Sequence, residues 1–336
     1  NGPGAWSVDS QTFWGTPISL FVFWIGLAHA GTLLSAIFLV LDIKLDKRTA
    51  MLAELSTLCS LAIAVVFPLV HLGVVDRFYM VMPFVDARMN MANIRSPLVW
   101  DFCCIGIYGI LSLVFFGTHL ASKRFEGLVK ARKPLAWLLF PLVLWVHTVV
   151  SLDFASTFVP HWAGAFFPLY FIVGAIYSGI ALVCVILWFE GYRVRILEQL
   201  LRIGSWLICS IWLWEFLTKG TFYSSAFVMA GVLPQLLWVS AIRNSRTCRL
   251  LIYLSILFGL LFERLFLVSP DLGIGTNFGL VDFGLASFGL GFFIIGFCGI
   301  RWKLGSAVEG ENTFFGEVDD SDMNAGSDLD AIAGDE

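Results

Sequence analysis

The chain alternates between long apolar segments and short polar connections. Nine segments are apolar on all sides over roughly 20 residues, the length that a helix needs to cross the hydrocarbon core of a membrane. Transmembrane strands would instead alternate in polarity over about ten residues. The pattern predicts an all-α, polytopic transmembrane bundle of about nine helices, arranged as two four-helix bundles and a peripheral helix. The predicted spans are 17–41, 50–72, 97–118, 135–155, 166–189, 203–217, 225–242, 250–268 and 278–300.

The distribution of cations predicts how these spans are oriented. Sixteen of the 21 Lys and Arg residues fall in one set of loops, four fall in the opposite set, and Arg264 lies inside a span. Positively charged loops stay in the cytoplasm, so we expect an outer N-terminus and a cytoplasmic C-terminus. A composition of 58% hydrophobic and 14% charged residues also excludes a set of soluble domains, which need more polar surface.

Three regions follow from the charge pattern. Residues 1–16 form an outer N-terminal segment, residues 17–303 form the transmembrane domain, and residues 304–336 form a tail. The tail holds ten acidic residues and no Lys or Arg, and we expect it to be disordered in the cytoplasm. The remaining 21 basic and 15 acidic residues give the rest of the chain a net charge of +6.

The seven cysteines show no spacing of a metal or haem site. They form no CxxC or CxxCH motif and no cluster with His, and they read as small buried hydrophobes. We therefore expect no haem, iron–sulfur cluster or metal site in this chain. A bis-His haem needs two imidazoles at equal depth, which His71 with His147 or His29 does not clearly provide.

Three ionisable residues are predicted to lie at one depth. His71 ends the second span, Asp101 lies about 6 Å into the third, and Asp153 lies near the end of the fourth. Ionisable groups at membrane depth are costly and often functional. Together they would suit a quinol, whose hydroxyls release protons as its electrons leave. The alternative for each is a capping or pairing role, such as Asp101 with Arg95.

Other polar residues are secondary candidates. Arg77 and Arg95, in the outer loop 73–96, would contribute to the quinol site. His147 is a further ligand or proton-path candidate, and His29 has small neighbours that favour a packing role over proton transfer. We expect a structural ion pair between Arg264 and Asp282, whose depths match. The candidate proton-path residues are His29, Glu54, Glu215 and Glu263.

Several ordered motifs resemble those of one membrane-protein family. The segments are FWIGLAHAGTLLSAI (23–37), FPLVHLG (67–73), RSPLVWDF (95–102), VHTVVSLDFA (146–155) and FFPLYFIVGAIYSGIA (166–181), followed by LWEF (213–216), LFERLFLV (261–268) and VDFG (281–284). They are similar to the NrfD/polysulfide-reductase membrane subunits, with most likeness to the ActC subunit of bacterial alternative complex III.

The resemblance implies a function and a set of partners. It implies a haem-free subunit of the bacterial inner membrane that oxidises menaquinol or another quinol near the outer face, with His71, Asp101 and Asp153 at the pocket. The partners implied are an outer iron–sulfur and molybdopterin-like subunit, multihaem c-type cytochromes, a homologous membrane subunit and a terminal oxidase, with coupled proton translocation. An ion-coupled transporter and a purely structural membrane anchor are the alternatives.

Overall fold

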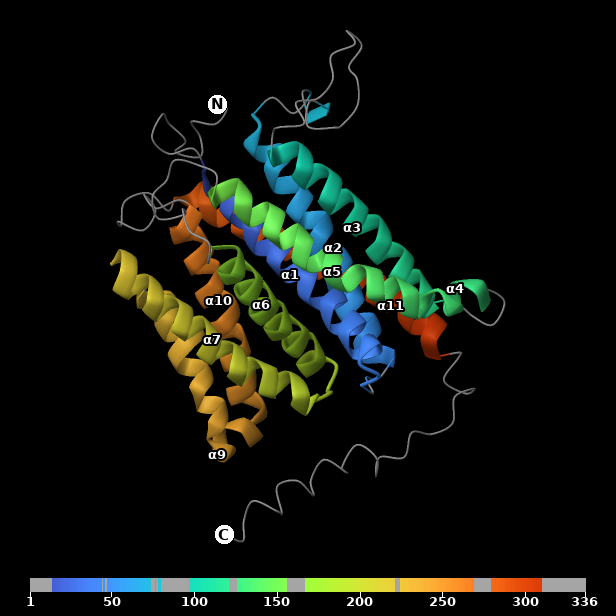
Figure 1. Cartoon of the computed structure of the whole chain (residues 1–336). Coiled ribbons are helices and arrows are strands. Elements are labelled where there is room, and N and C mark those ends of the chain that lie inside the picture. The colour runs from blue at the N-terminus through green and yellow to red at the C-terminus, as the bar shows by residue number, and fades with distance from the viewer. Residues whose placement is uncertain are drawn as a thin grey trace. The chain divides into compact units, whose positions relative to one another are not determined.

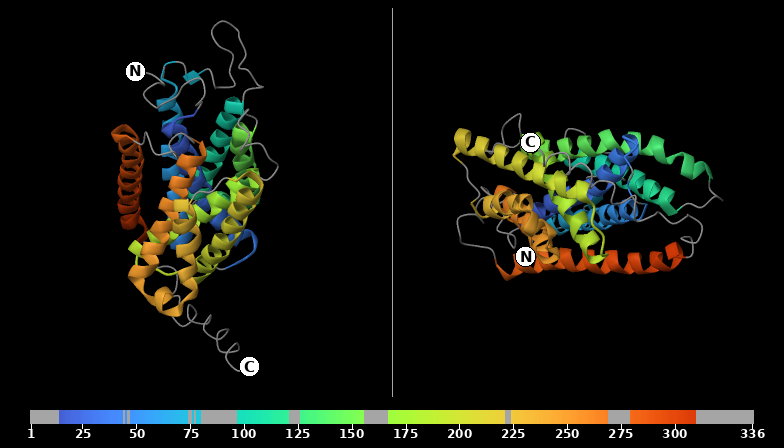
Figure 2. Two further views of the ribbon diagram at one scale, coloured as in Figure 1. Left: turned by 90° about the vertical axis from the view of Figure 1, so that its left-hand side faces the viewer. Right: turned by 90° about the horizontal axis from the view of Figure 1, so that it is seen from below.

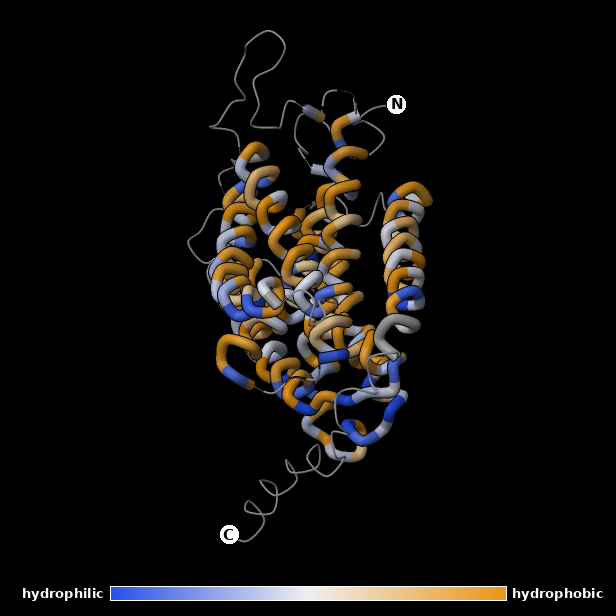
Figure 3. Tube along the Cα trace, turned by 90° about the vertical axis from the view of Figure 1, so that its right-hand side faces the viewer, coloured by the Kyte–Doolittle hydropathy of each residue, from blue (hydrophilic) through white to orange (hydrophobic). Residues whose placement is uncertain are grey.

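The computed structural model describes residues 14–43, 45, 47–73, 76, 78–79, 97–120, 126–155, 167–220, 224–268 and 279–309. Eight of its helices are long and apolar enough to cross a membrane. These are α1 (Thr16–Val40), α2 (Lys47–His71), α3 (Pro97–Leu120), α5 (Arg132–Ala155), α6 (Phe167–Phe189), α7 (Arg195–Lys219), α10 (Arg246–Val268) and α11 (Leu280–Glu309). Figure 3 shows long hydrophobic stretches along these helices. The all-α class predicted for a polytopic membrane protein is confirmed.

Two groups of helices form the body of the protein. In the first, α1 packs on α2 and α5, and α3 packs on α5 and α2. In the second, α6 packs on α7 and α10, and all views show these three helices together (Figures 1 and 2). Helix α1 also contacts α6 and α10, so it lies between the two groups and is buried along nearly its whole length. A helix that is apolar all round requires such a position.

Glycine allows α1 to approach its neighbours closely. A Cβ placed at Gly31 would collide with the backbone carbonyl oxygen of Ala53 in α2. A Cβ at Gly179 of α6 would collide with the side chain of Ala30. Small residues let membrane helices gain van der Waals contact where no water drives them together. The two contacts fix the depth at which the polar side chains of α1 meet those of α2 and α6.

The seventh predicted span is not a continuous α-helix. Residues 224–244 form a short helix α8 (Ser224–Ala226), a π-helix η4 (Phe227–Val232), a 3₁₀-helix η5 (Leu233–Trp238) and α9 (Ser240–Asn244). Pro234 lacks the N–H that an α-helix would use here. The Tyr177 hydroxyl donates to the Ala230 carbonyl (2.8 Å), and Gln235 Nε2 donates to the Gly231 carbonyl (3.3 Å). These bonds satisfy backbone groups that the break exposes.

Helix α11 spans a boundary between two compact units, which comprise residues 1–293 and 294–336. At its start, Asp282 Oδ2 accepts a hydrogen bond from the Gly279 backbone N–H (2.9 Å). The helix continues to Glu309, into the range assigned to the acidic tail. The tail beyond Glu309 and the N-terminal segment before Trp14 lie outside the described residues.

Candidate functional site

The carboxyl groups of Asp101 and Asp153 lie within hydrogen-bonding reach of each other. Asp101 is in the second turn of α3, Asp153 is in the last turn of α5, and the two helices pack together. Asp101 is only 7% exposed, and its Oδ1 has no hydrogen-bond partner among the described residues. A hydrogen bond between two carboxyl groups requires a proton on one of them. The pair is therefore a site where protons can be held and exchanged.

His71 lies at the same end of the first helix group but contacts the carboxyl pair indirectly. It is the last residue of α2, and its ring centroid is 5.8 Å from that of Trp14. The Trp14 ring is in turn 6.1 Å from Phe154, the neighbour of Asp153 in sequence. His71 Nδ1 is buried without a hydrogen-bond partner among the described residues. Arg77 and Arg95 lie outside the described residues.

Aromatic rings line the approach to the carboxyl pair. The Phe154 ring lies 5.7 Å from Phe171, which lies 4.7 Å from Phe167. With Trp14, these residues form an aromatic wall beside Asp153, built from the residue before the start of α1, from α5 and from α6. Sequence reasoning missed Trp14, because a tryptophan just before a span is commonly an interfacial anchor. Planar rings of this kind suit a flat aromatic ligand.

Two buried histidines meet between the carboxyl pair and the centre of the bundle. The His29 and His147 rings are perpendicular, with centroids 4.3 Å apart, and the Tyr108 ring lies 4.7 Å from His29. This direct contact leaves no gap for a porphyrin between the two imidazoles. Within the described residues, no group of three or more His, Cys, Asp or Glu side chains is arranged to hold a metal ion.

Glu54 extends this set of polar side chains toward the other end of α1. Glu54 is fully buried, and its Oε2 accepts a hydrogen bond from Thr32 Oγ1 (3.1 Å). His29 and Thr32 are three residues apart and therefore share one face of α1. We define the polar row as His147, His29, Tyr108, Thr32 and Glu54. It runs through the first helix group from the level of His147 to α2.

The other predicted proton-path residues lie in the second group. Glu263 is fully buried, and its Oε1 pairs with Arg264 Nη1 at 3.2 Å, while Glu215 pairs with Lys219 at 3.5 Å. The Arg264 guanidinium also lies over the Phe171 ring, 4.5 Å from its centroid. The expected Arg264–Asp282 ion pair is wrong, because Glu263 is the neighbour in sequence that reaches Arg264 first. Asp282 instead binds the backbone of α11.

Comparison with known proteins gives two matches. A family model described as "Polysulphide reductase, NrfD" matches residues 7–205, which contain the carboxyl pair, His71 and the polar row. A protein of Halobacterium salinarum (strain ATCC 700922 / JCM 11081 / NRC-1), described as a "Putative dimethyl sulfoxide reductase membrane subunit", is 27% identical over 214 residues. That match covers 55% of this chain and 48% of the relative, so the chain spans about half the length of this curated relative.

Proposed function

The chain belongs to the NrfD polysulphide-reductase family, and from this premise we propose that it is the quinol-oxidising membrane subunit of an oxidoreductase complex. Its substrate is a lipid-soluble quinol, such as menaquinol, and its electrons pass to an iron–sulfur partner subunit docked at the Asp101 end. The observation that supports this function best is the contact between the Asp101 and Asp153 carboxyl groups, with His71 and aromatic rings at the same end.

Quinol oxidation releases two protons and two electrons, so the site must accept both protons. In the proposed mechanism, one quinol hydroxyl donates to Asp101 Oδ1, which has no other hydrogen-bond partner among the described residues. The other hydroxyl donates to His71 Nδ1, which is buried and likewise unpartnered there. Asp153 accepts a proton from Asp101 and resets it for the next turnover. The product is the quinone, with both electrons on the partner's cluster.

The wider assembly belongs to the same proposal. The relative in Halobacterium salinarum is described as a membrane subunit of a dimethyl sulfoxide reductase. By analogy, this chain seats an iron–sulfur and molybdopterin-like subunit. The ActC-like motifs favour an alternative complex III in the bacterial inner membrane, with multihaem c-type cytochromes, a homologous membrane subunit and a terminal oxidase as further partners.

The test of this function compares quinol oxidation with solute uptake. The intact complex, purified with its partners, should reduce a dye when given a quinol analogue, and a quinone-site inhibitor should stop it. A structural anchor would give inhibitor-insensitive turnover, which contradicts the proposal. Solute uptake by vesicles without quinol-dependent dye reduction would favour the transporter.

A transporter of the broken-helix type is disfavoured by the first helix group. Such carriers pair two broken helices at mid-depth in related halves. The break at η4 and η5 lies in the second group. In the first group, α1, α2, α3 and α5 are each continuous over their described residues. The two groups therefore do not share the feature that would build a central ion site.

Trp14 is expected to hold the quinol ring against the aromatic wall. Trp14→Ala should raise KM for quinol by about tenfold, since an aromatic contact contributes about 0.5–1.5 kcal/mol beyond the area that it buries. Trp14→Phe should restore most of the affinity. Steady-state kinetics measure this, with Trp137→Ala as the control, because Trp137 is 57% exposed on α5. An unchanged KM in Trp14→Ala would remove the ring contact from the mechanism.

The polar row is proposed to couple quinol oxidation to proton translocation. Glu54→Gln keeps the side-chain shape and its acceptance of the Thr32 hydrogen bond but cannot carry a proton. We expect it to lower the number of protons moved per electron while dye reduction continues. The measurement is a proton-pulse experiment in vesicles that hold the whole complex. Glu190→Gln is the matched control, because Glu190 pairs with Arg48 outside the row. An unaltered proton ratio in Glu54→Gln would contradict the coupling.

A further inference from the structure

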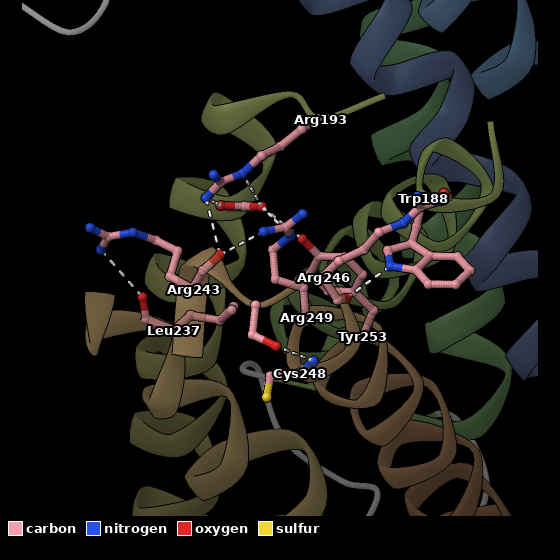
Figure 4. A network of polar contacts seen from close by, with 10 residues as sticks. Trp188, Arg193, Leu237, Arg243, Arg246, Cys248, Arg249 and Tyr253 are labelled. Atoms are coloured by element: carbon pink, nitrogen blue, oxygen red, sulfur yellow. Dashed lines mark hydrogen bonds and ion pairs between the residues drawn. The ribbon is translucent and has the colours of Figure 1, made fainter. Parts of the chain in front are cut away.

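A cluster of arginines lies at the end of the second helix group opposite Lys219. We define the arginine cluster as Arg193, Arg243, Arg246 and Arg249, which come from the segment after α6, from α9 and from the start of α10 (Figure 4). All four lie next to helix ends, the level at which lipid headgroups meet a membrane protein. From residue 188 to residue 253 the chain has six arginines, and Lys219 at the far end of α7 is the only lysine in that range.

The cluster is organised around one buried carboxylate. Arg193 Nε and Nη2 donate to the two oxygens of Glu198, at 3.0 and 2.8 Å, and Arg249 Nε lies 3.4 Å from Glu198 Oε1. The Tyr253 hydroxyl donates to the same oxygen at 2.9 Å. This bonding with Glu198 raises the pKa of the Arg193 guanidinium above its usual value. Because Glu198 neutralises one of the four guanidinium groups, the cluster keeps an excess of positive charge.

Backbone carbonyls and tryptophan hold the remaining guanidinium groups in place. Arg249 Nη1 donates to the Arg243 carbonyl (2.7 Å), and Arg246 Nη2 donates to the Trp188 carbonyl (3.0 Å). The Arg246 guanidinium also lies over the Trp188 ring, 4.6 Å from its centroid. Each guanidinium has five N–H groups, so these bonds leave donors for a ligand. The groups are pre-positioned, which lowers the entropy lost on binding.

A pocket opens within this arrangement. It has an empty volume of about 260 Å³ and is lined by Trp188, Tyr192, Arg193, Glu198, Arg249 and Tyr253. Its walls combine guanidinium groups with aromatic rings and aliphatic side chains. A ligand that matches these walls has a compact anion joined to an apolar portion.

We infer that the arginine cluster and its pocket bind the phosphodiester of an anionic phospholipid in the leaflet at this end. The positive-inside rule requires only cationic loops, and lysine would serve it as well as arginine. Phosphate recognition favours arginine, whose planar fork donates two parallel hydrogen bonds. Basic pockets between transmembrane helices are where anionic headgroups bind. The bound lipid would join α6, α9 and α10 at this end.

Native mass spectrometry of the complex in phosphatidylglycerol nanodiscs tests this inference. We expect the wild type to retain phosphatidylglycerol, and the double variant Arg243→Lys/Arg246→Lys, which keeps the charge and loses the fork, to retain about tenfold less. The matched control is Arg48→Lys/Arg132→Lys, which makes the same change at the starts of α2 and α5 and should retain the lipid. Equal retention in the Arg243→Lys/Arg246→Lys variant and the wild type would overturn the inference.

Thermal unfolding separates the lipid from free phosphate. Phosphatidylglycerol should raise the unfolding temperature of the wild-type complex more than phosphatidylcholine does, and inorganic phosphate added without the lipid should not. Stabilisation by inorganic phosphate equal to that by the lipid would contradict a lipid site. Quinol oxidation in detergent is a separate readout, so loss of lipid retention with intact turnover tests this site independently of the proposed function.

Discussion

Replacing Asp101 by Asn is expected to lower quinol oxidation by about two to four orders of magnitude, the contribution typical of a positioned general base. The amide keeps the size of the carboxyl group and can still hydrogen-bond to Asp153, so the helix packing of α3 on α5 should persist. What is lost is a proton acceptor that faces the quinol hydroxyl. The measurement is quinol-dependent dye reduction by the purified complex, with the presence of every partner protein checked on the same sample.

Two further variants control this result. Asp42→Asn removes a carboxylate that pairs with Lys133 at the surface, away from the carboxyl pair, and should leave turnover unchanged. Asp153→Asn should also be impaired, because Asp101 could no longer pass its proton on. Full turnover in Asp101→Asn, with the complex assembled, would remove Asp101 from the proposed mechanism.

Replacing Gly31 by Ala is expected to destabilise the protein strongly. The added Cβ would collide with the Ala53 carbonyl oxygen in the backbone of α2, and with Thr57 Oγ1 at 2.5 Å. A backbone atom cannot rotate away, so α1 and α2 would have to separate along their most extensive contact. Overpacking of this kind costs about 1–3 kcal/mol and sometimes more. The measurement is the thermal unfolding temperature in detergent, which should fall.

The matched control is Gly117→Ala in α3. A Cβ at Gly117 meets no atom within 4 Å. The same chemical change should therefore be neutral or slightly stabilising there, because alanine favours helix more than glycine does. If both variants unfolded at the same temperature, close α1–α2 packing would not be what holds the first helix group together.

The sequence predicted most of the fold because the membrane imposes a simple rule. Backbone groups in hydrocarbon must bond within a helix, so apolar segments of sufficient length become spans. The predicted span 166–189 and helix α6, at Phe167–Phe189, agree almost to the residue. The span 225–242 satisfied the same hydropathy test, yet it forms η4 and η5, because Pro234 and side-chain donors such as Tyr177 allow another bonding pattern.

The candidate site was accessible to sequence reasoning only in its depth. Counting 1.5 Å per residue placed Asp101 and Asp153 at one level, and α3 and α5 bring them into contact. Depth does not give the rotation of a helix about its axis. The contacts of His29 with His147, and of Arg264 with Glu263, depend on that rotation and on side-chain rotamers. The roles of these residues stay predictions.

Photolabelling with an azidoquinone is the most direct test of the central claim, that quinol binds at the Asp101 end of the first helix group. The intact complex would be illuminated with the label, digested and sequenced by mass spectrometry. We predict labelled peptides from the start of α3, the end of α5 and the segment around Trp14, with labelling suppressed by excess quinol. Quinol-protected labelling confined to α7, α10 or α11 would contradict the claim.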